Sequence, residues 1–331
     1  MDLFRDDDEN SIWSERYRLA ALNKDDALRI GLFCGAIALF VVMFHLVGNT
    51  TDAGAKGRSA IMWMISRWSD SSISMGNGNY SHGWLIFPTA IAIAWVKRKE
   101  ILLAPKSISK WGLAVIITGL LIHYVGAKAQ QTRLSLFGMM FLIWGLPFYF
   151  YGWQVAKRLM FPCAFLIFAI PFNFLENMAF PLRLLAANLS TAVLNGLGIK
   201  TIIEGTTIKS SAGGGFVFGV EDPCSGLRSL LAMTALTAVY SFFTQRTTIK
   251  KMLLFTSAIP LAIIGNIFRI TTIAIVAQAF GQELAGGLYH DYSGYLVFSI
   301  AIGLMVAFGA FLALDFKALY HKWKTNLLNR Y

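Results

Sequence analysis

Long apolar blocks separated by short polar segments dominate the chain. Eight of them can serve as membrane spans, for which about 20 residues cross a hydrocarbon core about 30 Å thick. The blocks cover about 28–47, 84–96, 111–126, 134–152, 159–170, 227–243, 252–276 and 295–314. The second and fifth are short, so we expect them to borrow flanking residues. The pattern predicts an all-α polytopic membrane protein with about eight transmembrane helices.

Two longer segments between blocks carry elements of their own. The first, about 48–83, is rich in Ser, Gly and Asn and contains a candidate interfacial helix at 61–68. The second, about 171–223, opens with an amphipathic pattern that predicts a helix on the membrane surface over 180–197. The expected apolar face of that helix is Leu182, Leu185, Leu189, Ala192 and Leu197.

The second segment continues with β-branched residues around Gly205 and then a Phe/Val-rich run at 216–220. Such alternation predicts a small β-hairpin or meander, with the three glycines 213–215 at its turn. The predicted organisation is a polar N-terminal segment (1–27), a transmembrane domain (28–315) with this extracytoplasmic insertion (171–223), and a basic tail (316–331).

Composition supports lipid as the main solvent of the chain. Of the 331 residues, 56% are hydrophobic and 14% are charged, whereas soluble domains average about 25% charged residues. The net charge of +11 does not indicate a nucleic-acid partner, because Lys and Arg cluster in short segments beside the apolar blocks. If the N-terminus is cytoplasmic, nineteen of the 29 basic residues fall in inner segments, as the positive-inside rule requires. We therefore predict a multi-pass cell-membrane protein with both termini in the cytoplasm.

The three cysteines lie far apart and form no metal or disulfide framework, so we expect neither a metal nor another cofactor. Cys34 and Cys163 sit inside apolar blocks, where a packed, inert thiol is the ordinary interpretation. Cys224 instead follows Asp222, a natural N-cap, and Pro223, which suits the first helical position. In that first turn the helix dipole favours a thiolate. The alternative is a cysteine that merely packs at a helix start.

Two further polar residues are expected at the same membrane depth as Cys224. Arg269 lies near the outer end of the seventh block, with Asn266 one turn earlier on the same helix face. Intramembrane charges are costly and usually functional, although an Arg at this depth can also snorkel to the headgroups. His290 falls in the outer loop just before the last block, where a lone histidine is usually plain polar surface. His82 lies at the same boundary and either lines a substrate groove or caps a helix.

This set of side chains fits thiol acyl transfer. Cys224 would attack a carbonyl, and His290 would protonate the leaving amine and then activate the second nucleophile. Arg269 would stabilise the oxyanion or hold the substrate. Arg228, four residues after Cys224, can bind an acidic substrate group or brace the loop.

The motifs at these residues resemble the exosortase/archaeosortase family of membrane transpeptidase-like enzymes. They are Cys224-Ser225-Gly226-Leu227-Arg228-Ser229, then Asn266-Ile267-Phe268-Arg269, then His290 with Gly294 four residues on. The resemblance, over about 28–315, implies a Cys224, Arg269 and His290 catalytic set. It also implies secreted substrates with a C-terminal sorting signal: a motif such as Pro-Glu-Pro, a transmembrane helix and a basic tail.

Two departures from the family pattern bear on specificity. Asp222-Pro223 before the cysteine is more acidic and rigid than expected, and Arg183 stands where a Gln is expected. Either can tune the motif that is accepted. A different class of function, a small-solute transporter using Arg269 and Asn266, would require inverted repeats and discontinuous helices at mid-membrane. The sequence shows neither, and a non-catalytic scaffold would give no reason for these residues at one depth.

Overall fold

The computed structural model describes residues 24–48, 57–69, 80–171, 173–211, 215–219, 227–285 and 290–314. The chain forms two compact units. One comprises Met1–Ser66 with Leu85–Ile170, and the other comprises Arg67–Trp84 with Pro171–Tyr331.

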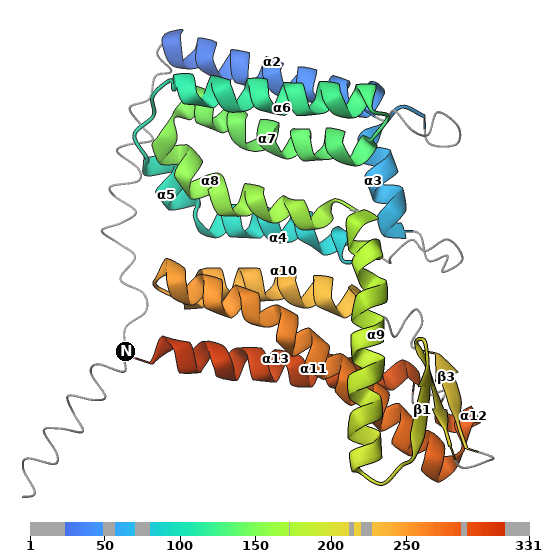
Figure 1. Cartoon of the computed structure of the whole chain (residues 1–331). Helices are drawn as coiled ribbons and strands as arrows, with labels where there is room; N and C mark the ends of the chain where they lie inside the picture. The colour runs from blue at the N-terminus through green and yellow to red at the C-terminus, as the bar shows by residue number, and fades with distance from the viewer. Residues whose placement is uncertain are drawn as a thin grey trace, which may run out of the picture. The chain divides into compact units, whose positions relative to one another are not determined.

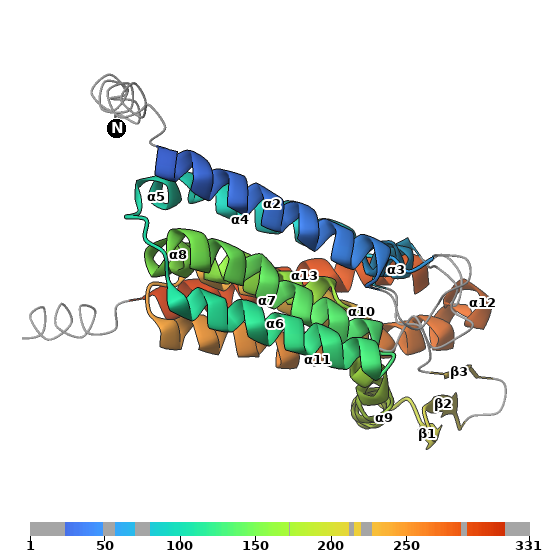
Figure 2. The same cartoon turned by 90° about the horizontal axis from the view of Figure 1, so that it is seen from above.

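The first unit is a stack of helices that run side by side (Figures 1 and 2). Its helices are α2 (Lys24–Leu46), α4 (Gly83–Val96), α5 (Arg98–Leu103), α6 (Lys110–Lys128), α7 (Thr132–Tyr151), α8 (Trp153–Phe165) and the short η2 (Leu166–Ala169). The helix α3 (Ala60–Ser69) matches the helix expected at 61–68.

Glycines bring α6 and α7 into backbone contact. A Cβ at Gly112 would lie 2.2 Å from the backbone N of Tyr149, and one at Gly138 would lie 2.6 Å from the carbonyl O of Gly119. Glycine allows this close approach because it has no side chain. In lipid, where no hydrophobic force drives helices together, such tight van der Waals packing stabilises the helix pair.

The second unit contains α9 (Asn173–Gly196), three strands, and the helices α10 (Leu227–Thr244), α11 (Thr248–Phe280), α12 (Gln282–Leu284) and α13 (His290–Ala313). The helices α10, α11 and α13 pack around a cluster of buried apolar side chains: Met233, Leu254, Ala262, Ala301 and Met305. At one end of this bundle the Nε2 atom of Gln245 donates a buried hydrogen bond of 2.9 Å to the carbonyl of Gly309.

The strands β1 (Thr201–Glu204), β2 (Thr207–Ser210) and β3 (Val217–Gly219) form an antiparallel sheet in the order β1-β2-β3. Gly205, with a φ of +63°, lies in the tight turn between β1 and β2, where glycine adopts the left-handed conformation without strain. The insertion is therefore a meander. The turn expected at 213–215 falls between β2 and β3, mostly outside the described residues, and the turn at Gly205 between β1 and β2 is a second one.

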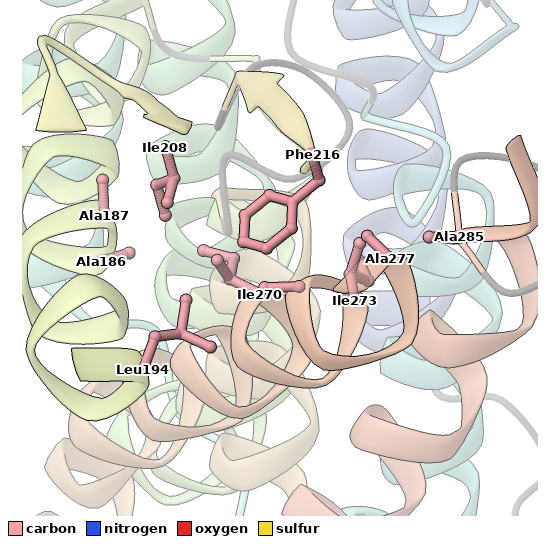
Figure 3. Close-up of a cluster of buried hydrophobic side chains, with 10 residues drawn as sticks. Ala186, Ala187, Leu194, Ile208, Phe216, Ile270, Ile273, Ala277 and Ala285 are labelled. Atoms are coloured by element: carbon pink, nitrogen blue, oxygen red, sulfur yellow. The ribbon is translucent and has the colours of Figure 1, made fainter. Parts of the chain in front are cut away.

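A second core joins this sheet to α9 and α11. Ile208 and Phe216 pack from the sheet onto Ile270 and Ile273 of α11, with Leu194 of α9 completing the cluster (Figure 3). The helix α9 lies across the end of α10 and crosses α11 (Figure 1). It begins seven residues before the predicted start at 180 and continues through Pro181.

The two faces of α9 differ in a way that suits a lipid environment. Its buried face consists mainly of small residues, among them Ala186, Ala187, Ser190 and Thr191. The expected apolar face is largely exposed, including Leu185, Leu189 and Leu197. That this face lies on the membrane remains a prediction.

Each of the eight predicted apolar blocks falls within a helical segment, but eight spans are not confirmed. Among the described residues, four helices are long and apolar enough to cross a membrane: Ala27–Leu46, Lys110–Lys128, Thr132–Tyr151 and Thr248–Phe280. Three shorter apolar helices lie at Gly83–Val96, Leu230–Thr244 and Phe298–Ala313. The fifth block is divided between α8 and η2, and α8 is not among these apolar helices.

Candidate active site

The length of α11 bears on the prediction that Arg269 lies at the edge of the membrane. This helix has 33 residues, or about 50 Å at about 1.5 Å per residue, whereas the hydrocarbon core is about 30 Å thick. Arg269 is 21 residues past Thr248, about 31 Å along the axis. Residues beyond it, among them Ile270 and Ile273, pack against α9 and the sheet, which fits that prediction.

The guanidinium of Arg269 lies against α13. A Cβ built on Gly294 would be 3.7 Å from both Cζ and Nη2 of Arg269 and 4.0 Å from Nε. These are ordinary van der Waals distances, so a methyl group would fit at residue 294, whereas a larger side chain would meet the guanidinium.

His290 is the first residue of α13, one turn before Gly294 and on the same side of the helix. The expectation that His290 lies in a loop was wrong: the helix begins five residues before the predicted block. The structure thus brings Arg269 and the start of α13 together at one end of the bundle, with His290 and Gly294 sharing a face.

Other polar residues cluster where α9 crosses α11. Asn266, one turn before Arg269, is only 8% exposed. The Oγ atom of Ser190 donates to the carbonyl of Ile267 at 3.5 Å, and Thr191 and Thr271 are also buried. Sequence reasoning missed Ser190, Thr191 and Thr271. For Ser190 and Thr191 the sequence did hold a signal, because they form a polar pair inside an otherwise leucine-rich amphipathic helix.

His82 lies in the turn before α4, in the same compact unit as Arg269 and His290. The turn is closed by a 2.8 Å hydrogen bond from the backbone N of Gly83 to the carbonyl of Tyr80. The rings of Tyr80 and His82 are 5.9 Å apart, and the indole of Trp68 occupies the space where a Cβ at Gly83 would stand. The two alternatives for His82, lining a substrate groove or capping a helix, remain predictions.

Cys224 and Gly226 lie outside the described residues, and Arg228 is in the first turn of α10. The described elements on either side are β3, which ends at Gly219, and α10, which begins at Leu227. Both belong to the second unit. Within the described part of the chain, no group of three or more His, Cys, Asp or Glu side chains is placed to hold a metal ion.

Comparison with known families identifies the family of the chain. The family model of the transmembrane exosortases matches residues 68–307, more than two thirds of the chain. The chain belongs to the transmembrane exosortase family. The exosortase match includes His82, Cys224, Arg269, His290 and Gly294. No curated protein and no solved structure matches the chain. Family membership supports a multi-pass membrane protein with a transpeptidase-like activity.

Proposed function

We propose that the protein is a membrane-embedded cysteine protease/transpeptidase. It cleaves the C-terminal sorting signal of secreted proteins and transfers or releases them at the outer face of the cell membrane. The observation that carries the proposal is the contact between the Arg269 guanidinium and Gly294 of α13, one turn from His290. An Arg that snorkelled to the headgroups would extend away from its neighbours. The Arg269 side chain instead extends from α11 toward α13, the helix that begins with His290.

The reaction would run through an acyl-enzyme. The Cys224 thiolate attacks the carbonyl carbon of the scissile peptide bond, and the Arg269 guanidinium stabilises the negative charge on the oxygen. The tetrahedral intermediate then collapses, the C–N bond breaks, and the His290 imidazolium gives its proton to the leaving amine. An acceptor amine or water gives a proton to His290 and attacks the thioester, which releases the Cys224 thiolate.

The remaining candidate residues would support this chemistry. Asn266 is buried on α11 one turn before Arg269, so its amide can orient the guanidinium. Arg228, in the first turn of α10, would bind an acidic group of the sorting motif. Gly226 would give the backbone after Cys224 room beside the substrate, and His82 would line the groove at the outer boundary.

The proposed topology puts both termini in the cytoplasm and the active site outside. The substrate would then be anchored by its own transmembrane helix with its basic tail inside, following the same positive-inside rule as the enzyme. Its cleavage motif would emerge at the level of Arg269.

Replacement of Cys224 tests the proposal directly. In the native host, Cys224→Ala should abolish processing of a signal-bearing protein, a loss of at least about 1000-fold. Cys34→Ser is the matched control, because Cys34 is an exposed cysteine on α2 outside the proposed site. Unchanged processing by a stably present Cys224→Ala protein would refute the nucleophile. Labelling of Cys224 by a membrane-impermeant thiol reagent from the cytoplasmic side alone would refute the topology.

A further inference from the structure

A single side-chain amide closes the outer edge of β3. The backbone N of Val217 donates to Oε1 of Gln282 at 3.2 Å, and Nε2 of Gln282 donates to the Val217 carbonyl at 2.7 Å. The backbone N of Ser210 donates to the Phe216 carbonyl, so the next pair, Lys209 and Val217, is a non-hydrogen-bonded pair. The polar backbone groups of Val217 therefore point away from β2, and Gln282 occupies the place of a fourth strand.

This pair of hydrogen bonds, the Gln282 clamp, joins two segments that lead to Arg269 and to Cys224. Gln282 follows Gly281, which ends α11 with a φ of +94°, and α11 carries Arg269. Val217 lies on β3, which ends at Gly219, five residues before Cys224. Five residues reach about 17 Å at most, and α10 begins three residues after Cys224, so β3 and α10 are the two anchors of the segment that carries the nucleophile.

We propose that Gln282 is a positioning residue for Cys224. Its amide fixes the strand that leads to the nucleophile against the helix that carries the oxyanion-stabilising Arg269. The inference rests on the proposed function, because it presupposes that Cys224 and Arg269 act on one carbonyl.

The opposite edge of the sheet supplies a matched control. There the backbone N of Thr201 donates to Oδ1 of Asn195 at 2.7 Å, and Nδ2 of Asn195 donates to the Thr201 carbonyl at 3.2 Å. The two backbone hydrogen bonds are of the same kind, and Oδ1 of Asn195 also accepts from Oγ1 of Thr201 at 3.3 Å. Asn195, however, holds β1, the strand that is not joined directly to Cys224. The strand residue Thr201 is buried whereas Val217 is exposed, so loss of the Asn195 hydrogen bonds should cost the fold at least as much.

The test compares the full-length protein with its Gln282→Ala, Gln282→Glu and Asn195→Ala variants in lipid nanodiscs. Three quantities are measured per folded protein: hydrogen exchange over 215–219, the pH profile of Cys224 alkylation by a maleimide, and kcat and KM on a synthetic sorting-signal peptide. Cys34 and Cys163 are replaced by Ser and Ala in all variants, so that alkylation reports Cys224 alone.

Loss of two edge hydrogen bonds in Gln282→Ala should lower kcat about tenfold, raise exchange at Val217 and alter the alkylation profile, with KM little changed. Gln282→Glu should lose at least as much, because a carboxylate cannot donate to the Val217 carbonyl. Asn195→Ala should keep the wild-type kcat and alkylation profile.

Three results would overturn the inference. Gln282→Ala could leave both kcat and the alkylation profile unchanged, or Asn195→Ala could show the same losses, which would mean general sheet stability. A lowered KM in Gln282→Ala would mean that the β3 edge receives the substrate strand and that Gln282 competes with it. Processing that survives Cys224→Ala would instead refute the proposed function, and that result does not depend on any Gln282 variant.

Discussion

The Arg269 guanidinium lies beside Gly294 of α13, with its Cζ and Nη2 atoms 3.7 Å from the point where a Cβ on Gly294 would stand. This contact joins the long helix α11 to the helix that begins with His290. It depends on residue 294 having no side chain larger than a methyl group.

The loss of activity on substitution of Gly294 should increase with the size of the new side chain. Gly294→Ala meets the guanidinium at ordinary contact distance and should retain most activity. Gly294→Leu should displace the guanidinium and lower kcat by about 100-fold, the cost of losing an oxyanion donor. The measurement is the rate of sorting-signal cleavage per folded enzyme.

Gly303→Leu is the control for that series. Gly303 lies on the same helix, and nothing is within 4 Å of the position of its Cβ. Equal losses at residues 294 and 303 would show that α13 simply does not tolerate leucine in place of glycine, and would remove the support that the contact gives to a catalytic Arg269.

Arg269 should not be replaceable by lysine. Lysine keeps the positive charge but loses the planar array of donors that an oxyanion requires, so Arg269→Lys should lower kcat by about 100-fold. Cleavage kinetics together with thermal unfolding in detergent would separate this effect from misfolding. If Arg269→Lys cleaves at the wild-type rate, a plain charge at the membrane boundary is sufficient and the oxyanion role is wrong.

The α6–α7 contact should control the stability of the first unit. A Cβ at Gly112 would lie 2.2 Å from a backbone atom of Tyr149, so Gly112→Ala must push the helices apart and should destabilise the protein by about 1–3 kcal/mol. Gly35→Ala makes the same change in α2, where nothing lies within 4 Å. A shift in melting temperature for Gly112→Ala, with none or a slight rise for Gly35→Ala, is the expected result. Equal melting temperatures would contradict the close packing.

Apolar blocks predicted the helices well because burial in lipid leaves a strong signal along the chain. Boundaries were poorer where helices leave the lipid. The start of α13 was placed at residue 295 because His290 and Asp291 read as loop, but a helix end outside the hydrocarbon needs no apolar residues. The helix α9 starts seven residues earlier than expected and continues through Pro181.

The chemistry was predicted only in part. Arg269 lies on a long apolar helix as expected, and its depth in the membrane remains a prediction. Its position beside Gly294 is a tertiary contact that no local pattern encodes. Gln282 was not singled out at all, because it is an exposed glutamine in a three-residue helix and its role depends on a strand 65 residues away. The expected place of Cys224 in the first turn of a helix remains a prediction.

The shared core of the sheet and α11 has a practical consequence. Ile208 and Phe216 of the meander are covered by Ile270, Ile273, Ala274 and Ala277, all on α11, a helix long and apolar enough to cross a membrane. A secreted fragment made from the insertion alone would expose that apolar surface to water and lack Arg269 as well. Solubilised versions of this enzyme must therefore keep α11, and with it a detergent or lipid shell.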